Sequence, residues 1–159
     1  MRFLIYFITS IISFLGLLVG YLLLRIAPEE QAPLAKYFSF TRRFALLLIF
    51  AFVVFYYTTN VFYLLTLLAY AGFIVFIEYG RHDPSNKIML SYAVLGAIFF
   101  LSSKNLNLFV IESSLIFLYG AISMSLVYNR KAKNMPGTIF YNCIFIIVAN
   151  SLSYFIPVN

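Results

Sequence analysis

The stretch that decides the fold is the first apolar run, residues 3–26, which reads FLIYFITSIISFLGLLVGYLLLRI. As a helix rising 1.5 Å per residue it would reach about 36 Å, enough to cross a hydrocarbon core of about 30 Å with some tilt. Arg2 ahead of the run fits the start of a signal peptide, but the run is longer than the apolar region of such peptides and no A-x-A-like cleavage site follows it. We therefore predict a retained transmembrane helix.

The rest of the chain has the same character. Its 159 residues are 64% apolar and 10% charged, whereas a typical soluble domain has about 25% charged residues. Side chains of that composition cannot cover a water-soluble surface, and the loops between the apolar runs are too short to fold separately. The predicted fold class is an all-α, polytopic integral membrane helix bundle, with residues 1–159 as a single transmembrane domain.

Apolar runs predict about six membrane-spanning helices. The boundary that needs an argument lies within residues 44–77, because one helix of that length would span about 51 Å. We divide it at Thr58-Thr59-Asn60, which leaves two short arms that form either a full hairpin or a re-entrant hairpin shielded by protein. The basic and aromatic segment 36–43 is expected to lie in the headgroup region. The expected helices are residues 3–26, 44–57, 61–77, 88–101, 108–128 and 139–156.

The distribution of Lys and Arg predicts the orientation. Of the eleven such residues, all but Arg2 and Lys104 lie at the first, third and fifth connections, and short loops rich in these residues stay in the cytoplasm. Loops 27–43, 78–87 and 129–138 are therefore expected in the cytoplasm, with both termini outside a cell membrane. Because the basic residues are spread between apolar runs, the net charge of +6 does not indicate a nucleic-acid partner.

Small residues predict how the helices pack. Ser13, Gly16 and Gly20 share one face of the first helix, and small side chains let helix backbones approach closely in lipid. We expect this face to pack against another helix of the same chain, with a contact between two copies as the alternative. Similar small pairs are Ala69/Gly72, Ala93/Gly96 and Gly120/Ser123.

Three polar residues inside apolar runs are candidates for intramembrane chemistry. Glu112 lies near the start of the run 108–128, where the helix dipole and the interface favour a carboxylate; a binding or gating role is the alternative. Asn142 and Asn150 are eight residues apart and fall near one helix face. Interhelical hydrogen bonds explain these two amides, and a polar pocket or solute path is the alternative.

The third connection carries the most varied side chains, including the only His and the only Asp. Its candidate catalytic residues are Glu78, His82 and Asp83, because carboxyl and imidazole groups perform acid–base chemistry. Its cations Arg81 and Lys87 are candidates for contact with lipid headgroups. Asp-Pro-Ser-Asn is also an ordinary turn sequence, so we favour a structural connector with a weak anionic-lipid contact. One His and two separated carboxylates are too few for a metal site.

Catalytic motifs do not identify a function. The sequence has no glycine-rich phosphate loop, zinc-protease motif or nucleophile elbow, and Cys143 is its only cysteine, so no cofactor or metal is expected. The leading hypothesis is a non-enzymatic multi-pass protein, and because no ionisable residue sits at a predicted helix centre, a proton-driven pump is not favoured. It would be either an accessory subunit of a membrane complex or a small permease for a neutral or lipid-like solute. The alternative is a membrane enzyme acting on phospholipid or polyprenyl-phosphate headgroups at the cytoplasmic face. Expected partners are membrane lipids and other membrane subunits or a second copy of the chain.

Overall fold

The protein folds as a bundle of helices, as the composition predicts. The computed structural model describes residues 3–27, 29, 31–57, 61–79, 84–127 and 135–155. These residues form seven α-helices and no strand, which confirms the all-α prediction. The helices are α1 (Phe3–Ile26), α2 (Gln31–Tyr57), α3 (Val61–Tyr79), α4 (Pro84–Ser102), α5 (Leu106–Val127), α6 (Met135–Asn142) and α7 (Ile144–Phe155).

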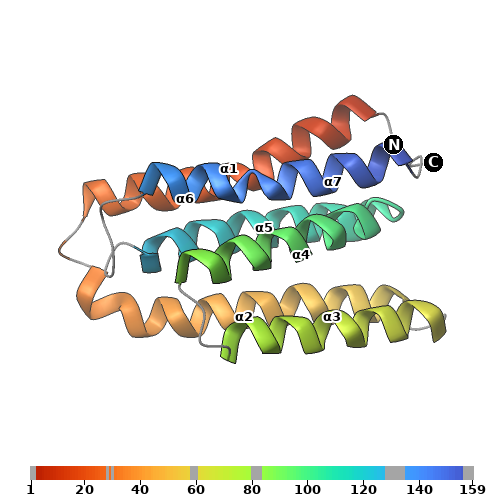
Figure 1. Cartoon of the computed structure of the whole chain (residues 1–159), viewed down its shortest axis with the longest axis horizontal. Helices are drawn as coiled ribbons and strands as arrows, with labels where there is room; N and C mark the ends of the chain where they lie inside the picture. Colours follow the sequence, from red (N-terminus) through yellow and green to blue (C-terminus); the bar gives the residue numbers. More distant parts are fainter. Residues whose placement is uncertain are drawn as a thin grey trace.

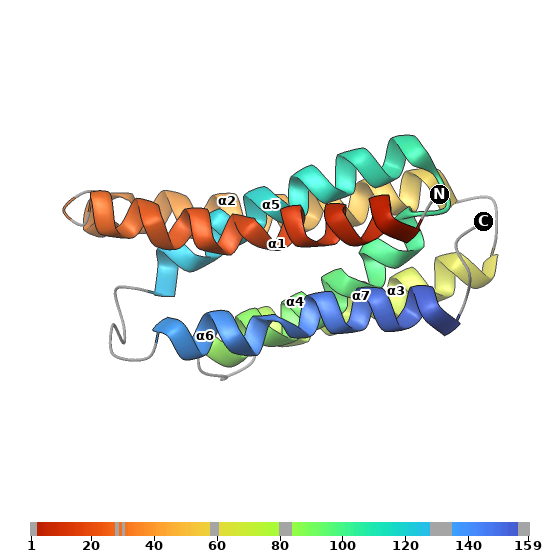
Figure 2. The same ribbon diagram turned by 90° about the horizontal axis from the view of Figure 1, so that it is seen from above.

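The helices lie in two layers (Figures 1 and 2). One layer contains α1, α5 and α2, with α5 in the middle, and the other contains α6 and α7 end to end, then α4, then α3. The two central helices, α4 and α5, pack on each other where the layers meet. The N-terminal end of α1 and the C-terminal end of α7 lie at the same end of the bundle (Figure 1).

Apolar side chains fill the bundle and also cover its outside. Fully buried residues come from both layers: Leu17, Ile49, Leu95, Ile116 and Phe145. Large apolar side chains point outward as well, which suits a surface in contact with hydrocarbon rather than water. Among the described residues, three helices are long and apolar enough to cross a membrane, namely Phe3–Ile26, Pro33–Tyr57 and Leu106–Leu126. Shorter apolar helices are Leu68–Ile77, Asn86–Ser102 and Ile139–Tyr154.

The second helix differs from its prediction. We expected it over residues 44–57, after a segment lying in the headgroup region, but α2 begins at Gln31 and continues without interruption for 27 residues. Pro33 does not prevent this, because it lies in the first turn, where backbone N–H groups have no helical partner. Thr41 also fits, since its hydroxyl donates to the carbonyl oxygen of Tyr37 at 2.9 Å. The basic segment is therefore the first part of a helix about 40 Å long.

Two other boundaries shift for local reasons. Helix α4 begins at Pro84 and not at residue 88, because the fixed φ of proline suits the first helical position. The helix predicted over residues 139–156 is divided at Cys143, whose N–H donates to the carbonyl oxygen of Phe140 at 3.1 Å, a tighter bond than the helical one. Ile147 then resumes the helical pattern by donating to the carbonyl oxygen of Cys143 at 3.1 Å.

Direct backbone contact joins α1 to α5. A Cβ atom added to Gly16 would lie 2.8 Å from the carbonyl carbon of Phe117, and one added to Gly20 would lie 2.9 Å from that of Ala121. Both distances are shorter than real Cβ contacts, so only glycine fits at these two positions. Ser13 is buried on the same face. Because residue numbers rise together on the two helices, α1 and α5 run in the same direction.

Candidate functional site

Three aromatic rings pack together inside the bundle, near the end where α1 begins and α7 ends, and form a first aromatic layer. The ring centroids of Tyr6 and Phe99 are 5.1 Å apart, those of Phe99 and Phe109 are 4.9 Å apart, and those of Tyr6 and Phe109 are 5.9 Å apart. All three side chains are buried. They come from α1, α4 and α5, so this first aromatic layer connects the two layers of helices.

A second aromatic layer lies deeper in the bundle. The Tyr92 ring contacts Phe14 at 6.5 Å and Tyr119 at 5.8 Å between centroids. Phe145 of α7 connects the two aromatic layers, with ring-centroid distances of 5.5 Å to Phe99 and 5.8 Å to Tyr92.

Polar side chains occupy the level between the aromatic layers. On α1, Ser10 follows Tyr6 by one turn and precedes Phe14 by one turn. On α5, Glu112 follows Phe109 by three residues, and both belong to its buried face.

The contact of Gly16 with Phe117 gives the register of α1 against α5. Extended back by five residues, this register places Glu112 at a level between Ser10 and Ser13 along the bundle axis, about 140° around α5 from Phe117. Asn150 of α7 joins them, because its Nδ2 donates to the Ser10 Oγ at 3.3 Å. We call Ser10, Ser13, Glu112 and Asn150 the polar layer.

Hydrogen bonds satisfy only part of the polar layer. Ser10 donates to the carbonyl oxygen of Phe7 at 2.7 Å, and Asn150 Nδ2 also donates to the carbonyl oxygen of Ile146 at 2.8 Å. Glu112 is 0% exposed, and neither of its carboxyl oxygens has a hydrogen-bond partner among the described residues. The same holds for Ser13 Oγ and Asn150 Oδ1.

This environment restricts the charge state of Glu112. An ionised carboxylate in an apolar interior costs several kcal/mol unless a counter-charge or hydrogen-bond donors compensate it. Glu112 must therefore be neutral in this arrangement, or a cation or water must accompany it. A group of this kind is able to exchange a proton or a cation.

Helix α5 begins earlier than expected, which places Glu112 further from the helix start than the sequence indicated. Helix α5 begins at Leu106, so Glu112 is its seventh residue, about 9 Å from the first and beyond the turn where the helix dipole acts. Asn105 caps that turn instead, its Oδ1 accepting from the N–H groups of Asn107 at 3.1 Å and Leu108 at 3.3 Å. The sequence signal that was missed is this Asn three residues before Leu108, which marks an earlier helix start.

The remaining predicted residues are placed as follows. Gly16 and Gly20 lie against α5, away from the polar layer. Asn142 is fully buried near the end of α6, which packs on α4. Lys87 is half-buried in the first turn of α4. The side chain of Glu78 and all of Arg81, His82 and Asp83 lie outside the described residues.

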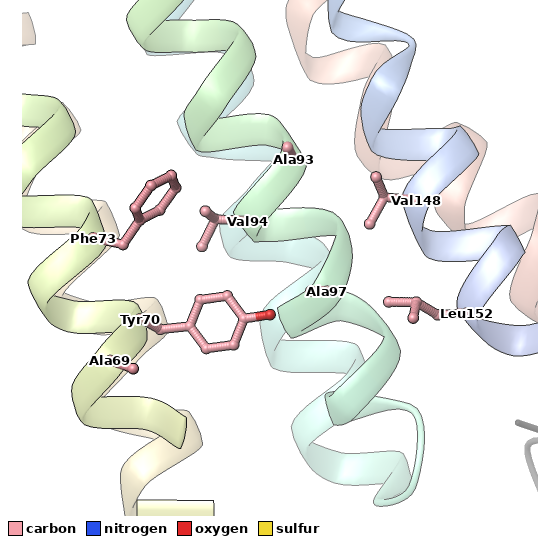
Figure 3. A pocket seen from close by; sticks show the side chains of 8 residues that line it. All are labelled: Ala69, Tyr70, Phe73, Ala93, Val94, Ala97, Val148 and Leu152. Atoms are coloured by element: carbon pink, nitrogen blue, oxygen red, sulfur yellow. The ribbon is translucent and has the colours of Figure 1, made fainter. Parts of the chain in front are cut away.

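An open groove lies between α3 and the helices α4 and α7 (Figure 3). It has a volume of about 580 Å³, and the Tyr70 hydroxyl is the only polar side-chain group among its lining residues. Those residues are Ala69, Tyr70, Phe73, Ala93, Val94, Ala97, Val148 and Leu152. The groove offers van der Waals contact but no charged group.

In the part of the chain that the structure describes, no three His, Cys, Asp or Glu side chains come together to form a metal-binding cluster. Comparison with known proteins finds no matching family, no matching curated protein and no matching solved structure.

Proposed function

We propose that this chain is a six-span permease of the cell membrane in which Glu112 gains and loses charge during transport. The observation that carries the proposal is the complete burial of this carboxyl group in the central helix α5, without a hydrogen-bond partner among the residues that the structure describes. Ionisable side chains inside membrane helices are rare and mark proton relays or ion and substrate paths. A carboxyl group kept only for packing would be replaced by an apolar side chain without loss.

The helix arrangement supports six crossings with both termini outside. Helices α2 and α3 are 27 and 19 residues long, about 40 and 28 Å, and both run along the length of the bundle (Figure 1). These lengths favour a full hairpin over a re-entrant one. An even number of crossings also accounts for both chain ends lying together, and the Lys and Arg distribution favours the cytoplasm for the opposite end.

The buried carboxyl changes the kind of permease. The sequence favoured a neutral or lipid-like solute without proton coupling, because no ionisable residue sits at a predicted helix centre. Glu112 removes that premise, so the proposed permease couples its solute to a proton or cation. The two aromatic layers serve as the barriers on either side of Glu112, and one of them must open for the carboxyl to reach water.

The other two hypotheses have less support. An accessory subunit needs helix packing and lipid contact, but it has no use for an unpartnered buried carboxyl. A headgroup enzyme would depend on Glu78, His82 and Asp83, for whose side chains the structure offers no geometry. Membrane lipids remain proposed partners, because large apolar side chains such as Phe55 and Phe76 face outward.

Purified protein in lipid vesicles tests the proposal. Vesicles loaded with a pH-sensitive dye are given a panel of small ions and neutral solutes, and the internal pH is recorded. We expect at least one solute to change the internal pH with the wild type and not with Glu112→Gln, which keeps the side-chain volume but cannot ionise.

Ser114→Ala is the matched control, since Ser114 lies on the exposed side of the same helix. It should behave as the wild type. Solute-driven pH changes that are equal in Glu112→Gln and the wild type, or a panel without any response, would contradict the proposal.

A further inference from the structure

The first half of α2 carries positive charge on an exposed helix face. Because this segment is helical, Lys36 lies one turn before Phe40 and two turns before Arg43, so the three residues share one face. All three side chains are exposed. Helix α2 has no Asp or Glu, and the carboxylates that precede it in the sequence are Glu29 and Glu30. The face therefore presents two cations without an acidic residue from its own helix.

Exposed aromatic rings lie on the same part of the helix. The ring centroids of Phe40 and Phe44 are 6.3 Å apart, and their ring planes are inclined by 8°, so the two rings are stacked. Phe40 is 71% exposed, Phe44 is 49% exposed and Tyr37 is 67% exposed. Such rings gain little from burial in the protein, whereas at a membrane interface they pack among lipid chains and headgroups. Cations mixed with aromatic rings are typical of a surface that contacts lipid at the headgroup level.

The length of α2 places this face at the headgroups. The helix has 27 residues, so it is about 40 Å long, about 10 Å more than the hydrocarbon core of a bilayer. The excess lies at the end that begins with Gln31, because residues 44–57 contain no charged side chain. Figure 1 shows the joined ends of α1 and α2 projecting beyond the neighbouring ends of α3 and α4. Lys36 and Arg43 therefore lie where the helix leaves the hydrocarbon.

We infer that the face of α2 formed by Lys36, Phe40 and Arg43, with Tyr37 and Phe44 beside it, binds the headgroups of anionic phospholipids. We call it the lipid face. Charge complementarity selects the lipid, because an ammonium and a guanidinium group attract phosphate and a zwitterionic headgroup offsets that attraction with its own cation. The inference goes beyond the proposed transport and does not depend on it.

A single tryptophan tests the inference, because the chain has none. Phe40→Trp places this reporter between the two cations, and the purified protein is reconstituted into vesicles of phosphatidylglycerol and phosphatidylcholine in which one of the two lipids is brominated. Bromine quenches tryptophan fluorescence on contact, so the ratio of the two quenching values measures the lipid preference at the reporter. We expect the anionic lipid to quench more strongly. Both leaflets contain both lipids, so the result does not depend on orientation.

A reporter at the other end of the same helix provides the control. Phe55 is 76% exposed and lies in the half of α2 that has no charged residue. Phe55→Trp should therefore be quenched equally by the two lipids.

Removal of the cations sharpens the test. In the Phe40→Trp protein, Lys36→Gln and Arg43→Gln should each lower the preference for the anionic lipid by a factor of up to about five, as expected for one cation at an anionic surface. Lys104→Gln removes the same charge from the turn between α4 and α5 and should leave the preference unchanged. Thermal melting of each variant in detergent shows whether it is folded.

Three outcomes would overturn the inference. They are equal quenching by the two lipids at Phe40→Trp, the same preference at Phe55→Trp as at Phe40→Trp, and a preference that survives the double replacement of Lys36 and Arg43 by Gln. Weak quenching by both lipids at Phe40→Trp would also overturn it, since a protein partner or a second copy would then cover the lipid face. None of these results bears on Glu112, whose role the transport assay tests separately.

Discussion

Helices α1 and α3 both carry closely spaced small residues, yet they pack in opposite ways. Gly16 and Gly20 bring the backbone of α1 into contact with α5. For Gly72 of α3, no atom of another described helix lies within 4 Å of the place its Cβ would take. Between α3 and α4 an open groove remains. The comparison shows that small residues permit a close approach but do not cause it, because in lipid the partner helix must also offer a complementary surface.

The same contrast extends to the rest of the two helices. Helix α1 buries a continuous stripe that includes Tyr6, Phe14 and Leu17, while Ile77 is the only fully buried side chain among those described on α3. The polar layer lies among α1, α5 and α7, the part of the bundle with the continuous packing. Helix α3 is the peripheral element, with few buried contacts to hold it.

The largest expected effect comes from glycine replacement. Gly20→Leu would force a side chain into the backbone of Ala121, and we expect loss of the folded protein in detergent, beyond the about 1–3 kcal/mol of an ordinary overpacked core. Gly72→Leu enters open space and should leave the melting temperature close to that of the wild type. Equal melting temperatures for the two variants would remove the distinction between the helices.

Removal of an aromatic ring should have the next largest effect. Phe99 is 0% exposed in the first aromatic layer, and Phe99→Ala should destabilise the bundle by about 3–5 kcal/mol. Phe73 lines the groove and is 43% exposed, so Phe73→Ala should cost well under half as much. Chemical denaturation in mixed micelles measures both, and a larger cost for Phe73→Ala would show that the groove is filled in the membrane.

A single hydroxyl group should give the smallest effect. The Tyr6 hydroxyl donates to the carbonyl oxygen of Ala149 at 2.9 Å and joins α1 to α7, so Tyr6→Phe should cost about 1 kcal/mol. Tyr70→Phe is the matched control in the groove and should change stability by less than that. The same denaturation measurement applies, and indistinguishable values for the two variants would show that this bond contributes nothing to joining the helices.

Helix α2 and Glu112 show where sequence reasoning ends. Charge and aromatic content led us to place residues 36–43 in the headgroup region and to begin the helix at residue 44, although nothing between Pro33 and Tyr57 breaks a helix. Composition describes the surroundings that a segment prefers, and a helix is able to continue through several of them. For Glu112, position in the chain suggested the interface, because distance from a helix end is visible in a sequence and burial by other helices is not.

The sequence by itself determined the all-helical class, the membrane character and the approximate position of each apolar run. These follow from composition and from the length of each run, which are local properties of the chain. Only the tertiary structure decided which small residues meet a neighbouring backbone and that Ser10, Glu112 and Asn150 share one level. The reason is that apolar helices are alike in hydropathy, so the choice of neighbours depends on side-chain shape at contacts between segments far apart in sequence.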